Sequence, residues 1–340
     1  MICIMLCLLI ATAGFIFTAP MNKRRTNVSV SENGKINATS GVSSFAGSGR
    51  GNTSTLAAPG ILSDVSQSAR AVLRLPPRRI AWGAYAGDTI ASAPLFETLV
   101  GRKMDLQPIF VGWNDPFPGE YAPTVRDDNK TLVIFWEQYG VTLDQIVSGD
   151  TDAYITEFAH AARLYGGKII LAPLHEMNGN WDPWDGTAEG NTPAKVVNAW
   201  RHIHDLFHDA HNVQFAWAVN NGSVPDTPEN AIALYYPGDA YTDYVAVDGF
   251  NDGKPWRSWS ESFESTLKEL SVYHKPIYIL SMSSAAGKAK AAWITDALTV
   301  EIPKHPEIVG WIWFNENKEQ HWSVESDAES LNAFKNGLPK

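Results

Sequence analysis

The chain has 340 residues, 44% of them hydrophobic and 19% charged, a composition typical of a globular protein with enough apolar content for a core. A net charge of -10, a pI near 5.4 and the lack of a basic stripe argue against nucleic acid as a partner. Nothing in the sequence indicates an obligate protein partner. The 13 Trp residues suit stacking on sugar rings, but Trp is also a common core filler.

Residues 1–20 are the first predicted segment. The run from Ile2 to Phe17 is almost continuously apolar, which suits a signal-peptide core and is slightly short for a membrane span. Its basic residues follow it, at 23–25, rather than precede it. We expect a secreted, extracellular protein, with membrane anchoring through residues 2–19 as the alternative. Both cysteines lie in this run, so its removal leaves no disulfide or thiol chemistry.

Residues 21–77 are rich in Ser, Gly, Asn, Thr and Ala and show no sustained apolar period. Such a segment buries too little apolar surface to offset its ordering entropy, so we predict a disordered linker. Residues 78–340 then remain for the compact part. Their number suits one large domain better than two.

Short apolar runs recur along residues 78–340, and each is continuous rather than alternating, as expected of parallel strands covered on both faces. The predicted strands are 78–84, 107–113, 131–137, 168–176, 213–219, 244–250, 276–281 and 308–314. Helical patterns fill most gaps, at 91–102, 151–165, 193–210, 260–273, 286–299 and 325–335. Residues 114–130 are loop-like instead, and residues 220–242 hold at most a short helix around 228–234.

This alternation of eight strands with helices predicts an α/β fold, a single (β/α)8 TIM barrel preceded by the signal segment and the linker. The alternative fold is a doubly wound open sheet. That fold favours a glycine-rich phosphate-binding turn after the first strand. The sequence at that point, WGAYAGDT, does not match G-x-G-x-x-G.

In a (β/α)8 barrel the active site lies at the C-terminal ends of the strands. The predicted ends carry indoles, amides and carboxylates, without a Cys nucleophile or a phosphate cradle. This pattern favours a site for neutral polar rings, and carbohydrate is the natural candidate. Hydrolysis needs two carboxylates, one as proton donor and one as nucleophile or base. The candidate sugar-binding residues are His175, Asn178, Trp181, Trp184, Trp113, Trp136, Glu137, Asp248 and Trp313.

Several of these candidates also have a structural interpretation. Glu137 and Asp248 suit hydrogen bonding at the barrel rim, and Trp136 and Trp313 suit packing within the barrel. Trp181 and Trp184 are stronger candidates for sugar contact because they lie in a predicted loop.

The most informative local stretch is LAPLHEMNGNWDPW, residues 171–184. Glu176 ends an apolar strand, and apolar walls raise the pKa of a carboxyl towards that of a general acid. The alternative is a Glu that pairs with a cation at the rim, and the two nearby Trp favour the acid. The pair His175–Glu176 does not continue into H-E-x-x-H, so we predict neither a metal nor a cofactor.

Three segments in combination resemble glycoside hydrolase family 26: HEMNGNW at 175–181, YYPGDAYTDYVAVDGFN at 235–251, and the closing KAAWITDAL and GWIWFNENKE. The resemblance covers essentially residues 80–322. The family contains mostly endo-β-1,4-mannanases, with some β-1,3-1,4-glucanases (lichenases) and β-1,3-xylanases. The resemblance implies a retaining (β/α)8 glycosidase that acts on a β-linked polysaccharide, either mannan or mixed-linkage glucan. It also implies that Glu176 is the acid/base.

The resemblance also identifies the position of the nucleophile. Family members usually read K-P-I-x-I-x-E-x-x-S, and KPIYILSMSS places Ser281 on the glutamate, with Ser284 fixing the register behind it. The chain has no Asp or Glu between Glu269 and Asp296, so a slip of the register recovers no carboxylate. Phe250, a further candidate sugar-binding residue, stands where the family often has a tyrosine that holds the nucleophile.

Three hypotheses follow. The chain is a glycan-binding pseudoenzyme, or an active glycanase whose nucleophile was exchanged for Ser281, or an enzyme in which Glu137, Asp248 or Glu316 acts as a base through water. The last requires an inverting separation of about 6.5–9.5 Å between carboxyls, against about 5–5.5 Å for retention.

We expect an endo-acting β-mannanase type, with a lichenase as the alternative. With Ser281 at the position of the nucleophile, the protein should hydrolyse its polysaccharide poorly, because serine without a base is a weak nucleophile.

Overall fold

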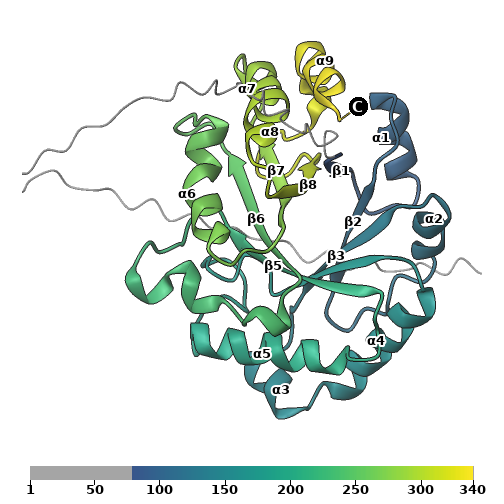
Figure 1. Ribbon diagram of the computed structural model, residues 1–340, viewed down its shortest axis with the longest axis vertical. Coiled ribbons are helices and arrows are strands. Elements are labelled where there is room, and N and C mark those ends of the chain that lie inside the picture. Colours follow the sequence, from purple (N-terminus) through teal and green to yellow (C-terminus); the bar gives the residue numbers. More distant parts are fainter. Residues whose placement is uncertain (1–78, 340) are drawn as a thin grey trace, which may run out of the picture. The chain divides into compact units, whose positions relative to one another are not determined.

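The computed structural model of the chain describes residues 79–339; the predicted signal segment and linker therefore lie outside the described residues. Within the described part, eight parallel strands close into a barrel in chain order, from β1 to β8. Figure 1 shows the strands at the centre with helices around them. The predicted (β/α)8 barrel is confirmed.

All eight predicted strands are present. Two of them end three residues from the predicted position, and the other six end within one residue of it. β4 stops before Glu176, which lies in a turn, and β7 continues through Ser281 instead of ending there. The strands are β1 (Ala81–Tyr85), β2 (Leu106–Gly112), β3 (Thr131–Glu137), β4 (Ile169–Pro173), β5 (Val213–Asn220), β6 (Tyr244–Asn251), β7 (Ile277–Ser284) and β8 (Ile308–Phe314).

The predicted helices correspond to α1 (Ser92–Val100), α4 (Asp152–Tyr165), α5 (Pro193–Leu206), α6 (Trp259–Ser271), α7 (Lys290–Asp296) and α9 (Ala328–Gly337). A π-helical turn (Ala297–Glu301) and α8 (Ile302–Lys304) continue α7. The region 220–242 holds only the short 3-10 turns Pro228–Asn230, Ile232–Tyr235 and Asp239–Tyr241. Within residues 79–339, no helix combines the length and the apolarity needed to cross a bilayer.

Two short helices were not predicted. The prediction of a loop at 114–130 was wrong in part, because α2 (Ala122–Asp127) lies there. The second is α3 (Leu143–Ser148), which begins at a capping box formed by Thr142 and Gln145. Each has six residues, too few to show a helical period in the sequence.

Side chains along each strand alternate between the inside of the barrel and the layer beneath the helices. Along β3, Val133 and Phe135 pack inside, whereas Ile134 and Trp136 pack outside. The inner cluster combines small side chains with large ones, so that it fills the barrel. Its buried members are Leu106, Val133, Phe135, Ile170, Ala172, Ala216, Ala218, Ala246, Tyr278, Leu280 and Ile312.

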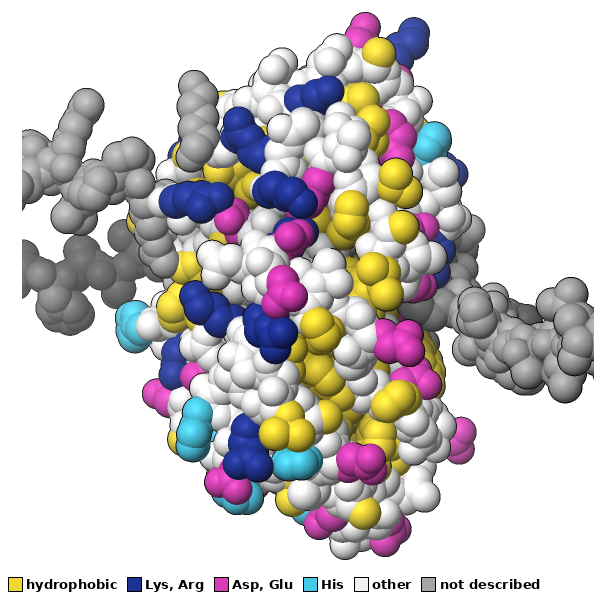
Figure 2. Space-filling view, turned by 90° about the vertical axis from the view of Figure 1, so that its right-hand side faces the viewer, with side chains coloured by type: hydrophobic (Ala, Val, Ile, Leu, Met, Phe, Trp, Pro, Cys, Tyr) yellow, Lys and Arg dark blue, Asp and Glu magenta, His cyan; other side chains and the backbone are white. Residues whose placement is uncertain are grey.

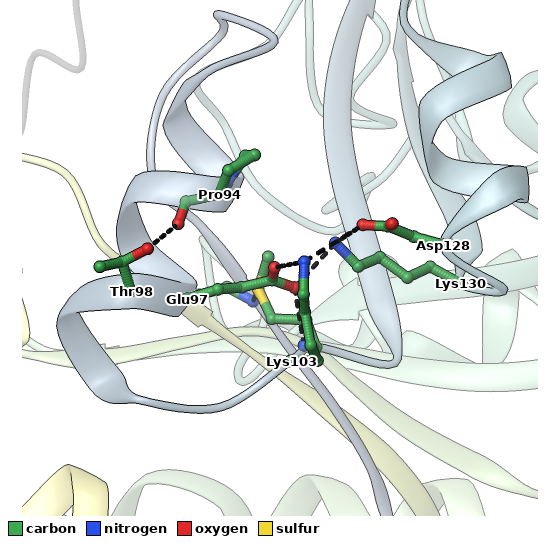
Figure 3. Close-up of polar contacts among 8 residues, drawn as sticks. Pro94, Glu97, Thr98, Lys103, Asp128 and Lys130 are labelled. Carbon is green, nitrogen blue, oxygen red and sulfur yellow. Dashed lines mark hydrogen bonds and ion pairs between the residues drawn. The ribbon is translucent and has the colours of Figure 1, made fainter.

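An ion-pair network around the buried Glu97 ties α1 to the start of β3 (Figure 3). Lys130 Nζ lies 2.7 Å from Glu97 Oε1, and Lys103 Nζ lies 2.7 Å from Glu97 Oε2. Burial raises the pKa of Glu97, but hydrogen bonds from Lys103 and Lys130 more than offset this and lower it overall. On the face shown in Figure 2, by contrast, Lys and Arg side chains lie exposed among Asp, Glu and apolar side chains.

Lys130→Met is expected to lower the free energy of unfolding by about 3 kcal/mol, because Glu97 loses one of its two cations while it stays buried. Lys195→Met is the matched control, since it breaks an exposed pair with Asp144 and should cost about 1 kcal/mol or less. Urea unfolding measures both variants. Equal losses would contradict a stabilising role for the buried pair.

Candidate active site at the barrel mouth

The last inner positions of the strands form the mouth of the barrel. On β3, Glu137 follows the inner residue Phe135 by two positions. On β6, Asp248 and Phe250 continue the inner face that Ala246 begins. Because alternate residues of a strand share one face, these side chains are directed to the same central space.

The turn after β4 brings Glu176 to this space through an unusual backbone. Leu174 and Glu176 both have positive φ angles, 51° and 56°, which non-glycine residues adopt at a cost of about 1–3 kcal/mol each. Two hydrogen bonds hold them there. The Leu174 N–H donates to Gln138 Oε1 at 2.8 Å, and the Glu176 N–H donates to the Ala218 carbonyl at 2.9 Å. The backbone of Glu176 is therefore fixed by two neighbouring strand ends.

The loop after Glu176 holds its carboxylate. Trp181 Nε1 donates to Glu176 Oε2 at 2.9 Å. Gly179 permits this approach, since a Cβ there would lie 2.7 Å from the Trp181 ring. Asp185 Oδ2 in turn accepts the N–H groups of Trp181 at 2.8 Å and Asp182 at 2.9 Å. Burial, with the charge of Asp182, raises the pKa of Asp185 to about 8.

His175 lies between two carboxylates. Its Nδ1 is 3.7 Å from Asp248 Oδ2 and its Nε2 is 4.0 Å from Glu137 Oε1. Burial alone lowers the pKa of His175, but the nearby Asp248 and the charges of Glu176 and Asp182 raise it to about 9. Burial raises the pKa of Glu137, and His175 opposes that shift. At neutral pH the site therefore contains an imidazolium that partly neutralises its carboxylates.

Ser281 lies at a bulge in β7. Val247 of β6 pairs with Ile279, but the next residue, Asp248, pairs with Ser281, so β7 contains one extra residue. The pairing of β7 with β8 is irregular over the same stretch. Such a bulge changes the direction of a side chain relative to a regular strand, and bulges are frequent beside active sites.

The bulge directs Ser281 into the barrel. Ile279 and Met282 both pack in the outer layer, and Leu280 packs in the inner cluster. With one extra residue between the two outer side chains, Ser281 lies on the inner side together with Leu280. Its register partner Asp248 also faces inward. The structure thus brings Ser281, Asp248, His175 and Glu137 to one space, with Glu176 and Trp181 at its edge.

Three predicted sugar-binding indoles do not reach this space. Trp136 stacks on Trp113 at 4.8 Å and on Phe158 of α4 at 4.4 Å, between the strands and the helices. Trp313 packs against Phe334 of α9 at 5.5 Å. Trp136 and Trp313 have the outward parity in their strands, and Trp113, in the turn after β2, packs on Trp136. All three therefore lie in the outer core layer rather than at the mouth.

Two further predicted residues support the site from within the protein. Trp184 is fully buried, and its Nε1 donates to the His175 carbonyl at 2.8 Å. Asn178 is also fully buried, and it exchanges hydrogen bonds with the backbone of Asn220 at 2.8 and 3.1 Å. Asn178 thereby joins the turn after β4 to the end of β5.

An aromatic cluster forms another wall of the mouth. Tyr85 stacks on Phe314 at 5.4 Å, and Trp322 packs on Phe250 at 5.1 Å. The hydroxyl of Tyr85 donates to Asp88. Phe314 and Trp322 were not among the predicted site residues. Strand parity indicates Phe314, whereas Trp322 lies in the loop after β8 and has no comparable signal in the sequence.

A barrel whose C-terminal mouth holds carboxylates and aromatic rings is typical of glycoside hydrolases. Residues 124–335 match glycosyl hydrolase family 26, and the chain belongs to this family. Family membership makes it a glycoside hydrolase of the β-glycanase class.

Two relatives with known names illustrate the range of the family. The chain is 34% identical over 271 residues to Endoglucanase H of Acetivibrio thermocellus, which covers 75% of this chain and 30% of that protein. It is 26% identical over 179 residues to Mannan endo-1,4-beta-mannosidase A and B of Caldalkalibacillus mannanilyticus, covering 49% and 33%. The chain thus spans about a third of the length of these relatives.

Solved structures share the fold at lower identity. The catalytic domain of the Bacillus sp. JAMB-750 GH26 endo-beta-1,4-mannanase superposes with a TM-score of 0.58 at 16% identity, over 76% of this chain and 85% of that one. The YdhT protein of Bacillus subtilis superposes with a TM-score of 0.59 at 15% identity, over 78% and 88%.

The imidazole of His175 is expected to titrate near pH 9 in an NMR titration, and Asp248→Asn should lower its pKa, because burial then acts with less opposition. Asp209→Asn, at an exposed position, is the control. Since the folded pKa lies above the unfolded value of about 6.5, His175 stabilises the fold fully below that pH. This contribution is lost as the pH rises through about 9. A pKa of His175 that is the same in both variants would contradict the assigned pair.

Proposed function

We propose that this chain is an endo-acting β-glycanase of the retaining type, with Glu176 as acid/base and with Ser281 at the position of the nucleophile. The observation that carries the proposal is the bulge on β7. It directs position 281 into the barrel beside Asp248, and Glu176, held by Trp181, lies at the same mouth. This supports a glycosidase site in which the side chain at 281 lacks the carboxylate.

Glu176 would protonate the leaving glycosidic oxygen. Its hydrogen bond from Trp181 Nε1 orients the carboxyl, and orientation is a large part of general acid catalysis. In the first step of a double displacement, a nucleophile on the other side of the sugar attacks the anomeric carbon while the leaving oxygen is protonated. In the second step, water activated by the acid/base carboxylate releases the sugar from the nucleophile. The hydroxyl of Ser281 is a weak nucleophile without a base, so this chain should hydrolyse slowly or only bind its substrate.

For the substrate we propose β-linked glucan first and β-1,4-mannan second. The family resemblance seen in the sequence alone favours mannan first. The identity to a protein named an endoglucanase is higher than the identity to the mannosidase, and it extends over more of the chain, which supports the reversed order. Among the glucans we favour mixed-linkage β-glucan, because the family that the chain resembles includes lichenases.

We further propose that the protein is exported and acts outside the cell. A polysaccharide is too large to enter a cell, and the apolar run from Ile2 to Phe17 has the composition of a signal-peptide core. The N-terminus of protein recovered from the growth medium, read by mass spectrometry, tests this proposal. A protein retained in the membrane would contradict it.

Ser281→Glu is expected to raise the rate of hydrolysis of mixed-linkage β-glucan by about 1000-fold or more, because it supplies the missing nucleophile. Release of reducing sugar measures the rate. Ser281→Gln is the matched control, since it has the same shape without the charge, and it should stay inactive. Rapid hydrolysis by the unaltered chain would refute the assignment. Binding of glucan by all three proteins without activity would favour the pseudoenzyme.

Within the Ser281→Glu protein, Glu176→Gln is expected to lower kcat/KM, which reports the first step, by about 100- to 10,000-fold on glucan. The loss should be much smaller on an aryl β-glycoside whose phenol leaves without protonation. Glu229→Gln, at an exposed position, is the control and should change neither rate. Equal losses on both substrates would show that Glu176 is not the acid.

A further inference from the structure

Lys290, at the start of α7, is completely buried. Its Nζ donates to the carbonyls of Ser323 at 2.7 Å, Trp322 at 2.9 Å and His321 at 3.2 Å. Burying a lysine costs free energy unless its ammonium finds such partners. Burial lowers the pKa of Lys290 to about 8, while Asp327 and Glu325 oppose the shift. All three acceptors belong to the segment between β8 and α9.

The carbonyl of Trp322 has two further donors. Ser283 Oγ of β7 donates to it at 3.0 Å, and Trp313 Nε1 of β8 donates at 3.2 Å. Three side chains from α7, β7 and β8 therefore converge on one peptide oxygen. A backbone group held by three bonds from three elements has little freedom to move.

The indole of Trp322 lies near the ends of β6 and β7. It packs on Phe250, whose register partner is Ser283. These two inner positions come two residues after Asp248 and Ser281 on the same strands. The bonds to the Trp322 carbonyl therefore also hold the aromatic wall that the indole forms. This wall lies two residues further along β6 and β7 than Asp248 and Ser281.

We propose that Lys290 is a positioning residue for carbohydrate binding: it holds residues 315–323 so that the Trp322 indole forms one wall of the sugar site. The inference rests on the proposed β-glycan function for the sugar, and on the contacts above for the positioning. Lys290 itself touches no substrate, because its three protons face carbonyls inside the protein.

Hydrogen exchange of the free chain tests the positioning. Lys290→Met should accelerate amide exchange in residues 315–323 by about tenfold, because three carbonyls lose their donor. Lys288→Met, two residues before Lys290 and exposed, should leave exchange unchanged. If Lys290→Met fails to fold, Ser283→Ala removes another donor to the same carbonyl and should produce the same change to a smaller degree. Unchanged exchange in these residues would overturn the proposal.

Affinity for a mixed-linkage β-glucan tetrasaccharide, measured by calorimetry, tests the role in binding. Trp322→Ala and Lys290→Met should each weaken binding by about fivefold to tenfold. The double variant should bind no more weakly than Trp322→Ala, because Lys290 acts through the indole. Additive losses would indicate a merely structural lysine and would overturn the proposal.

The two measurements also separate this inference from the proposed function. If the unaltered chain binds neither the glucan nor a mannan tetrasaccharide, the proposed function and the sugar-binding part of the inference both fail. Hydrogen exchange still decides whether Lys290 holds the loop. If the unaltered chain binds and Lys290→Met binds equally well, only the inference fails.

Discussion

In a closed barrel every strand has one face inside and one outside, and this constraint decides which side chains reach the mouth. It sends Glu137 and Asp248 inward and Trp136 and Trp313 outward. Because the sheet closes on itself, the inner faces of distant strands converge. Carboxylates from β3 and β6 therefore meet around His175.

The sequence predicted the barrel because each buried strand is a continuous apolar run and the runs alternate with amphipathic helices. It also located Glu176, since that residue lies in a motif with neighbouring indoles. For Trp136 and Trp313, position at a strand end left both sugar contact and packing open. The two-residue period of each strand decides for packing, and it indicates Phe314 as a side chain of the mouth.

Other features could not be predicted, because they depend on hydrogen bonds between distant parts of the chain. The positive φ angles of Leu174 and Glu176 are held by Gln138 and by the Ala218 carbonyl, from β3's end and from β5. Ser281 reads as the end of a strand, yet pairing with β6 extends β7 to Ser284. Local propensity carries no information on such contacts.

The bulge on β7 separates the direction of a side chain from its identity. Leu280 is anchored inside the barrel and Met282 in the outer core, so the residue between them can be exchanged while both anchors stay packed. A fluorinated reporter or a photoreactive group introduced at 281 would face the interior along the same vector as the native hydroxyl. Position 281 is thus a suitable attachment site for chemical probes, because the backbone determines the direction in which they project.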